Sequence, residues 1–375
     1  MKLCTDYEVL DLFCGAGGLS LGFKHAGFRI ALAVDKWEPA VDTYKYNHPD
    51  ARVLYCDIKE VDSSSLKNVA DNKSMIIIGG PPCQGFSLAN TKSRNPCNEN
   101  NQLSWKFIEL VSEVKPKIFV MENVYGIFSL KINGKDVAAE IDRILKSAGY
   151  DLKVLKLSAE NFGVPQVRRR VFFIGLYKKS LNISEKNVPC SRLYYTVRDA
   201  ISDLARVKAL PDTEKDMHAS YHVTLRGNPK SEYQKKMRDS EKVFNHVYHK
   251  PYRIAIERMK YIREGENLYR ARSRIPKDLL VPSAQNGKIH MNIYRRLAWN
   301  KPSPTIVHVR KAMLIHPSYN RLLTAREAAR LQGFPDSYRF FGTLNQQYQM
   351  IADAVPPPMA SAIANLVKNI INRLK

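Results

Sequence analysis

The sequence predicts an α/β protein with two unequal domains, and three observations support this. A chain of 375 residues with 44% hydrophobic content can bury one large core and a smaller one. Up to about residue 178, short apolar runs alternate with longer amphipathic segments, which is the rhythm of strands and crossover helices in a parallel sheet. Beyond that residue the rhythm breaks and basic residues accumulate.

The predicted strands are six apolar runs in the first half of the chain. They are Glu8–Leu12, Arg29–Val34, Met75–Ile78, Ile118–Met121, Tyr150–Leu157 and Arg170–Tyr177. Several end in a polar or glycine-rich turn, and in an open α/β sheet ligands bind at the carboxyl ends of the strands. We therefore expect functional residues in those turns. The longest apolar stretches are too short to cross a bilayer.

Two helices are predicted near the end of the chain. Leu323–Leu331 has a helical pattern, with Thr324 as the N-cap and Glu327 completing a capping box before Pro335 closes the helix. Met359–Leu374 repeats apolar residues at helical spacing, so we expect a terminal helix docked on the core.

The middle of the chain is basic. Residues 186–300 hold 24 lysines and arginines against 12 acidic residues, a net charge of +12 out of +23 for the whole chain. Tyrosines are interleaved there, including Tyr194, Tyr195, Tyr221, Tyr233, Tyr248, Tyr252, Tyr261 and Tyr269. A solvated basic domain with core tyrosines would look similar, but phosphate binding needs this charge, so we favour a nucleic-acid surface.

The six cysteines form no Cys-x-x-Cys pair, which argues against a disulfide framework, and we predict no metal site. No signal peptide precedes the first apolar run, so we expect a soluble intracellular protein. Cys4, Cys56 and Cys190 are interpreted as inert core residues. Cys83 differs, because Gly79–Ser87 places it on a loop that prolines stiffen at the end of a strand.

The turn after the first predicted strand, Asp11–Ser20, is rich in glycine, so its backbone can approach a ligand closely. Asp35 ends the second strand, where nucleotide-binding domains place an acid for ribose hydroxyls, although it could simply cap a helix at Glu38–Tyr46. The glycine spacing fits neither a dinucleotide site nor a phosphate loop, which disfavours NAD and ATP. Adenosine without phosphate fits better, and Asp57 is placed to accept a hydrogen bond from an adenine amino group.

Two further strand ends carry charged residues. The run Ile118–Met121 ends in Glu122 and Asn123, and a buried carboxylate is costly unless it is paired or functional. Desolvation at such a place raises proton affinity, so Glu122 is suited to act as an acid. Arg168 and Arg170 alternate along an extended segment, so they can face one site.

In this order, the runs resemble the DNA cytosine-C5 methyltransferase family of the bacterial or archaeal restriction-modification type. The resemblance covers roughly the first half and the last fifth of the chain. The matching stretches are Asp11–Gly22, Gly79–Ser87, Glu122–Val124, Gln166–Arg170, Arg296–Ile306, Leu323–Pro335 and Ile351–Pro357. Seven matches in sequence are a strong signal.

The resemblance implies a Rossmann-like, S-adenosylmethionine-dependent methyltransferase fold: an α/β mixed sheet with a smaller, basic target-recognition domain. Residues 1–185 plus 345–375 would form the catalytic and cofactor-binding domain, and 186–344 the target-recognition domain and hinge. The implied partner is double-stranded DNA, with a cognate restriction endonuclease acting separately. We expect a monomer in the cytoplasm, associated with the nucleoid and not with a membrane.

The resemblance also implies roles for residues. Cys83 is the nucleophile that adds to C6 of a flipped-out cytosine, and Glu122 is the acid at N3. The other catalytic residues are Gln84, Asn123, Arg168 and Arg170. The residues that bind S-adenosylmethionine are Asp11, Phe13, Cys14, Gly15, Ala16, Gly18, Asp35, Lys36, Asp57, Ile58, Pro81, Asp353 and Ala354.

Two departures from the family pattern stand out. Ala352 and Asp353 occupy places that usually hold glycine and asparagine, and Lys36 stands where the family often has an apolar residue against the adenine. Two other readings stay open. A tRNA methyltransferase of the same family would typically have proline at Gly85 and a smaller basic insert, and a non-catalytic DNA-binding relative would have lost Cys83 or Glu122, which are both present.

Overall fold

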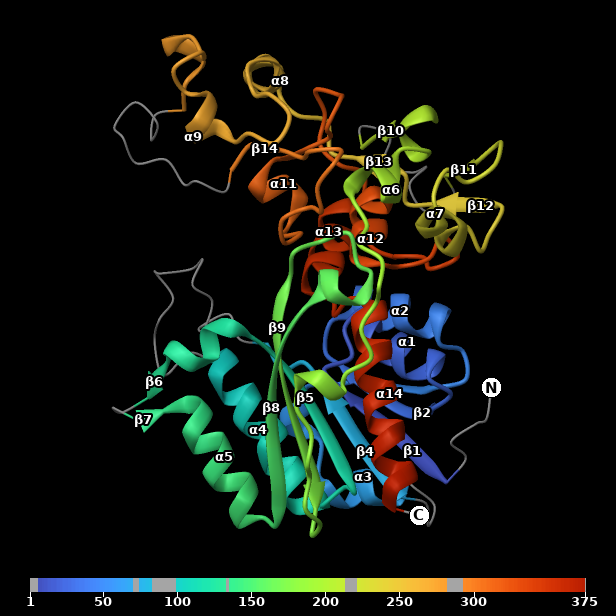
Figure 1. Cartoon of the computed structure of the whole chain (residues 1–375), viewed down its shortest axis with the longest axis vertical. Coiled ribbons are helices and arrows are strands. Elements are labelled where there is room, and N and C mark those ends of the chain that lie inside the picture. Colours follow the sequence, from blue (N-terminus) through green and yellow to red (C-terminus); the bar gives the residue numbers. More distant parts are fainter. Residues whose placement is uncertain are drawn as a thin grey trace. The chain divides into compact units, whose positions relative to one another are not determined.

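The computed structural model describes residues 6–69, 74–82, 99–132, 135–212, 221–281 and 293–374. The chain divides into two compact units (Figure 1). Unit 1 comprises Met1–Phe162, Arg169–Ser191 and Val355–Lys375, and unit 2 comprises Gly163–Arg168 and Arg192–Ala354. Unit 1 is therefore built from three separate stretches of the chain.

A seven-stranded sheet organises unit 1. Its strands are β1 (Tyr7–Leu12), β2 (Arg29–Asp35), β3 (Arg52–Tyr55), β4 (Ser74–Gly79), β5 (Ile118–Val124), β8 (Tyr150–Ser158) and β9 (Arg169–Tyr177), in the order β3-β2-β1-β4-β5-β9-β8. The first five are mutually parallel. The six predicted strands are all present, and the mixed α/β fold class is confirmed.

The parallel rhythm read from the sequence is wrong for the last two strands. β9 pairs antiparallel with both β5 and β8, and it lies between them. Only residues 159–168 join β8 to β9, which is too short for a helical crossover, so the chain must turn back beside the strand it has just left. The mixed sheet implied by the family resemblance is the correct description.

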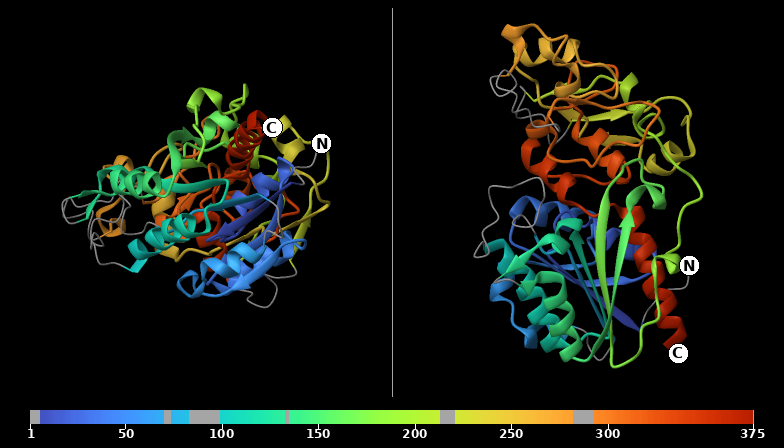
Figure 2. Two further views of the ribbon diagram at one scale, coloured as in Figure 1. Left: turned by 90° about the horizontal axis from the view of Figure 1, so that it is seen from below. Right: turned by 60° about the vertical axis from the view of Figure 1, so that its left-hand side comes forward.

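Helices cover the sheet because its strands bury residues on both faces. One face packs against α3 (Ser63–Val69), α4 (Glu99–Val114) and α5 (Val137–Ser147) through a continuous apolar core that includes Leu10, Leu32, Ile77, Phe107 and Ile141. Figure 2 shows α4 and α5 side by side against the strands. Two short strands, β6 (Lys131–Ile132) and β7 (Lys135–Asp136), precede α5.

The helices α1 (Gly18–His25) and α14 (Pro357–Leu374) pack tightly against each other. A Cβ placed on Gly22 would lie 2.3 Å from the Cβ of Ala360, so only glycine allows this approach. The Lys368 ammonium also donates to the Ala26 carbonyl at 2.9 Å. The predicted docked terminal helix is confirmed. Unit 1 further contains α2 (Glu38–Asn47) and the 3₁₀ turns η1 (Ile58–Glu60), η2 (Tyr125–Ser129), η3 (Ala159–Phe162) and η4 (Glu185–Asn187).

Unit 2 consists of short elements in its described residues. Its helices and 3₁₀ turns are α6 (Val197–Ile201), η5 (Leu204–Arg206), α7 (Glu232–Met237), α8 (Arg253–Lys260), α9 (Leu268–Ala271), η7 (Lys277–Leu279), α11 (Val309–Ala312), α12 (Ala325–Gln332) and α13 (Leu344–Asp353). Its strands form two-stranded pairs: β10 (Leu210–Pro211) with β13 (Val247–Tyr248), β11 (His222–Thr224) with β12 (Lys242–Phe244), and β14 (Arg295–Arg296) with β15 (Leu314–Ile315).

The centre of unit 2 is the fully buried helix α12, which begins as predicted. The Thr324 hydroxyl accepts from the Glu327 N–H at 3.0 Å, and the Glu327 carboxylate accepts from the Thr324 N–H at 2.8 Å, which completes the capping box. Gly333, in the left-handed conformation with φ 90°, ends the helix. The predicted helix is confirmed, although it ends at Gly333, ahead of Pro335.

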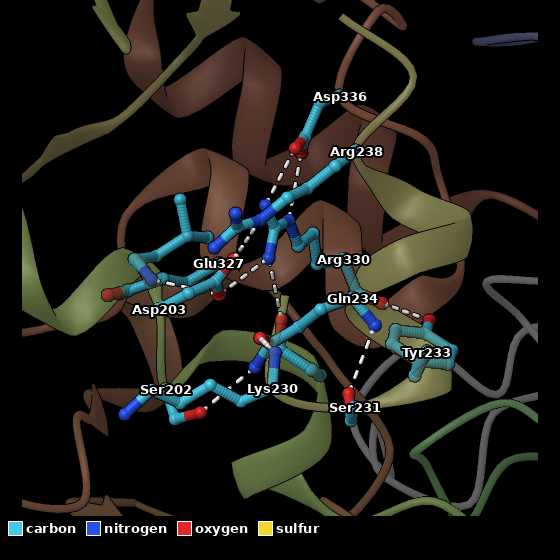
Figure 3. Close-up of polar contacts among 12 residues, drawn as sticks. Ser202, Asp203, Lys230, Ser231, Tyr233, Gln234, Arg238, Glu327, Arg330 and Asp336 are labelled. Atoms are coloured by element: carbon cyan, nitrogen blue, oxygen red, sulfur yellow. Dashed lines mark hydrogen bonds and ion pairs between the residues drawn. The ribbon is translucent and has the colours of Figure 1, made fainter. Parts of the chain in front are cut away.

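A buried network of charges holds α12 in place (Figure 3). The Arg330 guanidinium binds both carboxylate oxygens of Asp336, at 2.8 and 2.6 Å, and also donates to Asp203 at 2.7 Å. Asp203 takes a second ion pair from Arg238 at 2.8 Å, and Tyr233 donates to the Arg330 carbonyl. A buried charge is tolerated when its hydrogen-bonding groups have partners, which is the case for this arginine.

The prediction of inert, buried cysteines is wrong for Cys190, which is exposed. It lies on the irregular segment after η4, outside the strands and helices that create a core. Cys56 is partly buried and packs against the main apolar core. Cys4 lies outside the described residues. Of the interleaved tyrosines, Tyr195 and Tyr233 are buried, whereas Tyr194 and Tyr252 are exposed, so the core interpretation holds for only part of the set and the nucleic-acid surface stays a prediction.

Candidate active site

The carboxyl ends of the parallel strands meet at the edge of the sheet where most predicted site residues lie. β1 is hydrogen-bonded to β2 on one side and to β4 on the other, so the strand order reverses there. Ligands of open α/β sheets bind at such a reversal. Gly79 belongs to this edge, because a Cβ on it would lie 2.1 Å from the Leu12 carbonyl oxygen.

The turn after β1 has an unusual backbone. Phe13 (φ 69°), Gly15 (φ 51°) and Gly17 (φ 84°) all have positive φ angles, and the Phe13 and Cys14 N–H groups both donate to the Val34 carbonyl at 3.0 Å. No atom lies within 4 Å of a Cβ built on Gly15, so the space beside it is open. Cys14 and Ala16 are buried, and burial raises the pKa of the Cys14 thiol. α1 then begins at Gly18, one of the predicted cofactor-binding residues.

Asp35, at the end of β2, joins this turn to the next one. One carboxylate oxygen accepts from the Gly15 N–H at 2.8 Å, and the other accepts from the Trp37 N–H at 2.9 Å. Burial raises the pKa of Asp35, against these two hydrogen bonds. Trp37, and not Asp35, is the N-cap of α2. The simple helix-cap reading of Asp35 is therefore wrong, and the carboxylate lies between two turns of the strand-end edge.

Lys36 and Asp57 form an ion pair across the ends of β2 and β3, with 3.1 Å between the ammonium nitrogen and a carboxylate oxygen. The other Asp57 oxygen accepts from the Lys59 N–H at 3.1 Å and caps η1. The Lys59 N–H and Lys36 lower the pKa of Asp57. Ile58 beside it is buried.

Asp11 lies beneath the turn. It is 1% exposed, and its carboxylate accepts from the Ser20 hydroxyl at 2.5 Å, while the Tyr44 hydroxyl donates to Ser20 at 2.6 Å. Burial raises the pKa of Asp11 to about 7, against the hydrogen bond from Ser20. In this position Asp11 fixes the start of α1 from below. Sequence reasoning gave no role to Ser20 or Tyr44, although a tyrosine on the buried face of α2 requires a partner for its hydroxyl.

β4 leads through Gly79, Gly80 and the buried Pro81 toward the predicted nucleophile loop. Cys83 and Gln84 lie outside the described residues. A Cβ on Gly80 would lie 3.1 Å from a carboxylate oxygen of Glu122, so the end of β4 passes close to that side chain. The absence of a side chain at Gly80 leaves room for the carboxylate.

Glu122 and Arg170 face each other at the ends of β5 and β9. A carboxylate oxygen of Glu122 lies 2.7 Å from Nε of Arg170, and the side chains are 10% and 12% exposed. The antiparallel register sets Arg170 opposite Val124. Glu122 is two residues before Val124 and therefore on the same face of the sheet, so it is a diagonal neighbour of Arg170. Asn123 is buried, and its side-chain oxygen accepts from the Val124 N–H at 2.8 Å. A carboxylate fixed by an arginine at a strand end can bind a polar group of a substrate.

A family model for C-5 cytosine-specific DNA methylases matches residues 7–369. The chain belongs to the C-5 cytosine-specific DNA methylase family. It is accordingly an enzyme, a DNA (cytosine-5) methyltransferase. In the described part of this methylase, no helix is both long and apolar enough to span a membrane.

Similar proteins agree with the family assignment. The methylase is 37% identical to Type II methyltransferase M.DdeI of Desulfomicrobium norvegicum, over 97% of its own length and 91% of the relative. It is 34% identical to Type II methyltransferase M1.HphI of Haemophilus parahaemolyticus, over 97% and 87%. A prophage-encoded E. coli protein described as a DNA modification methyltransferase has a similar structure, with a TM-score of 0.77 at 29% identity over 98% and 99% of the two chains.

The structure gives the two predicted arginines of the methylase different partners. Arg168 is buried in unit 2, where its guanidinium donates to the Ile306 carbonyl at 3.3 Å and the Ala352 carbonyl at 2.8 Å. The alternation argument assumed one continuous strand, but β9 begins only at Arg169. A role for Arg168 in the catalytic site stays a prediction.

The predicted residues of the last motif also belong to unit 2. Asp353 is exposed at the end of α13, where its carboxylate accepts from the Gln349 amide at 2.8 Å, and Ala354 caps the helix. The backbone carbonyl of the preceding Ala352 is bound by Arg168. The motif is thus held through its backbone, which a sequence pattern of side chains does not reveal.

Proposed function

We propose that this methylase transfers a methyl group from S-adenosylmethionine to C5 of a cytosine flipped out of a specific duplex DNA sequence, through a covalent bond between Cys83 and C6. One observation carries the proposal. Glu122, in β5, lies beside Gly80, which directly follows β4 in the sequence that leads to Cys83, and Arg170 holds the Glu122 carboxylate at 2.7 Å. The roles of Cys83 and Gln84 come from the sequence.

The proposed chemistry follows from the weak reactivity of cytosine. C6 becomes an electrophile when N3 is protonated or hydrogen-bonded, so Glu122 holds a proton at N3 while the Cys83 thiolate adds to C6. C5 thereby gains carbanion character and takes the methyl group. Loss of the C5 proton then expels the thiolate and restores the ring. Arg170 keeps the Glu122 carboxylate in position throughout.

The strand ends of unit 1 fit an adenosine-containing cofactor. The space beside Gly15 is open, and the carboxylates of Asp35 and Asp57 each keep lone pairs for further donors. S-adenosylmethionine would supply an electrophilic methyl group on its sulfonium. The residues that would surround it are Phe13, Cys14, Gly15, Ala16, Gly18, Asp35, Lys36, Asp57, Ile58 and Pro81, with Asp11 supporting the turn, and with Asp353 and Ala354 as the contribution of the last motif.

We propose that residues 186–344 recognise the DNA target and that residues 1–185 with 345–375 carry catalysis. Flipping a base out of the duplex costs a few kcal/mol, which protein contacts must offset. The net charge of +12 in residues 186–300 suits the phosphate backbone, and exposed rings such as Tyr194 and Tyr252 can pack against the nucleic acid.

The decisive experiment incubates purified protein with methyl-labelled S-adenosylmethionine and duplex DNA. We expect label in the DNA and none with Cys83→Ala, and bisulfite sequencing should map it to one cytosine within one sequence. Equal labelling by Cys83→Ala would disprove the nucleophile assignment. Preferential labelling of tRNA would move the substrate to the family's RNA branch.

The role of the basic region has its own test. Affinity for duplex DNA should fall steeply between about 50 and 200 mM salt, because each phosphate contact releases a counterion. Fluorescence anisotropy with a labelled duplex measures this. A flat dependence on salt would contradict the role of residues 186–300.

The names of the relatives favour a role in a restriction-modification system. Because the similar proteins are Type II methyltransferases, we propose that this one protects DNA against a separately acting restriction endonuclease, as a cytoplasmic, nucleoid-associated monomer. A plasmid from cells that express the protein should resist endonucleases whose site contains the methylated cytosine. Cleavage at the methylated site would contradict the protective role. The proposed monomer is tested separately, by light scattering, which should give the mass of one chain.

A further inference from the structure

Lys36 lies between two acidic residues of the strand-end edge. Its ammonium group is 3.1 Å from a carboxylate oxygen of Asp57, and its charge also acts on the neighbouring Asp35. β2 and β3 are adjacent parallel strands with Asp35 opposite Tyr55, so Asp57 follows on the next strand just past Asp35. Lys36 therefore bridges the two strand ends electrostatically.

The Asp57 carboxylate is fixed before any ligand arrives. One oxygen accepts from the Lys59 N–H and the other from Lys36, both at 3.1 Å. The side chain is 27% exposed, and each carboxylate oxygen can accept a second hydrogen bond. The result is an acceptor of fixed direction with free capacity facing solvent.

Lys36 also offsets an excess of negative charge. Asp11, Asp35 and Asp57 lie at the carboxyl ends of three neighbouring strands. The charge of Asp35 raises the pKa values of Asp11 and Cys14, in addition to the larger effect of burial. Burial raises the pKa of Asp35, and the positive charge of Lys36 opposes that rise. Removal of Lys36 would leave these acids with one cation fewer.

We propose that Lys36 is a positioning residue for the nucleoside of the cofactor. It holds Asp57 to accept a hydrogen bond from the exocyclic amino group of the base. This rests on the proposed function, because it assumes that the nucleoside lies at these strand ends. Through Asp57, Lys36 thus selects a base that carries an amino group.

The test measures binding of S-adenosylhomocysteine and S-inosylhomocysteine, in which an oxygen replaces the amino group, by titration calorimetry on the full chain. Lys36→Met should weaken S-adenosylhomocysteine binding by about three- to tenfold and reduce the preference over S-inosylhomocysteine. Lys36→Arg, which keeps the charge, should retain most of both. Lys45→Met, at an exposed lysine on α2, is the matched control and should bind like wild type.

The outcomes separate the two proposals. Unchanged affinity and unchanged base preference in Lys36→Met would overturn the role of Lys36 while leaving the cofactor site intact. An equal loss for both ligands would show that Lys36 does not act through Asp57 and would also overturn it. Failure of the wild-type protein to bind S-adenosylhomocysteine would overturn the proposed function and this inference together.

Discussion

Two carboxylates of unit 2 and two of unit 1 have different hydrogen-bond partners. In unit 2, Glu327 binds the Arg321 guanidinium through both oxygens, at 2.8 and 2.7 Å, and Asp336 binds Arg330 in the same way. In unit 1, the hydrogen bonds to Asp11 and Asp35 come from neutral groups, namely the Ser20 hydroxyl and the N–H groups of Gly15 and Trp37.

The pKa directions differ accordingly. Burial alone would raise the pKa of Glu327, but the charge and hydrogen bonds of Arg321 outweigh it and hold the pKa below the usual range. For Asp11, burial wins and raises the pKa to about 7. The arginine partner of Glu327 thus keeps that buried carboxylate ionised, whereas the neutral partners of Asp11 leave its charge responsive to protons.

The largest effect should come from removing Arg330 from its buried ion pairs with Asp336 and Asp203. Arg330→Met removes the cation that binds the buried Asp336 and one of the two cations that bind Asp203. The free energy of unfolding should therefore fall by about 3–5 kcal/mol. Arg238→Met is the control and should cost about 1 kcal/mol, because Asp203 keeps Arg330. Urea titration measures both. Equal losses would mean that the network does not stabilise unit 2 in this way.

Glu122, which we assign to catalysis, should affect activity more than stability. Glu122→Gln should reduce methyl transfer by about 10²- to 10⁴-fold, because the proton at N3 is lost, while S-adenosylhomocysteine affinity stays within about twofold. The free energy of unfolding should fall by about 1–2 kcal/mol, less than for Arg330→Met, because the ion pair with Arg170 is lost but the glutamine oxygen can still accept its hydrogen bond. Single-turnover transfer assays and urea titration together test this. A loss of stability like that of Arg330→Met would place Glu122 with the structural carboxylates.

Asp11 allows a test by pH. Its folded pKa of about 7 lies above the unfolded value of 3.8, so between these pH values the folded state binds more protons. Its contribution to stability is complete below pH 3.8 and is lost as pH rises through 7, on the order of 1 kcal/mol per pH unit. Asp11→Asn should flatten this dependence in urea titrations from pH 4 to 8. If the unfolding free energy of wild type and of Asp11→Asn changed equally with pH, the raised pKa of Asp11 would be contradicted.

The smallest effect concerns two capping boxes in unit 2. Thr324→Ala, at the buried start of α12, should cost about 1–2 kcal/mol of unfolding free energy. Thr343→Ala, at the exposed start of α13, should cost about 0.5 kcal/mol, because water replaces the lost acceptor. Thermal and urea unfolding compare the two, and equal costs would show that burial adds nothing to the cap.

Much of unit 1 could be predicted from local patterns. The apolar runs predicted the strands, and the polar residues after them predicted the site edge, because both depend on neighbours in the sequence. The antiparallel place of β9 could not be predicted from the rhythm, since strand order depends on contacts between distant segments. Likewise Arg168 and Arg170 look equivalent in sequence, but their partners, Ala352 and Glu122, come from different units.

The contact between Gly22 and Ala360 has a consequence for biosynthesis. α1 leaves the ribosome long before the helix that covers it, because α14 lies at residues 357–374. Until α14 emerges, the face of α1 that packs against it has no cover. Unit 2 is complete in the nascent chain by Ala354, so the unit that begins first is the unit that must finish last.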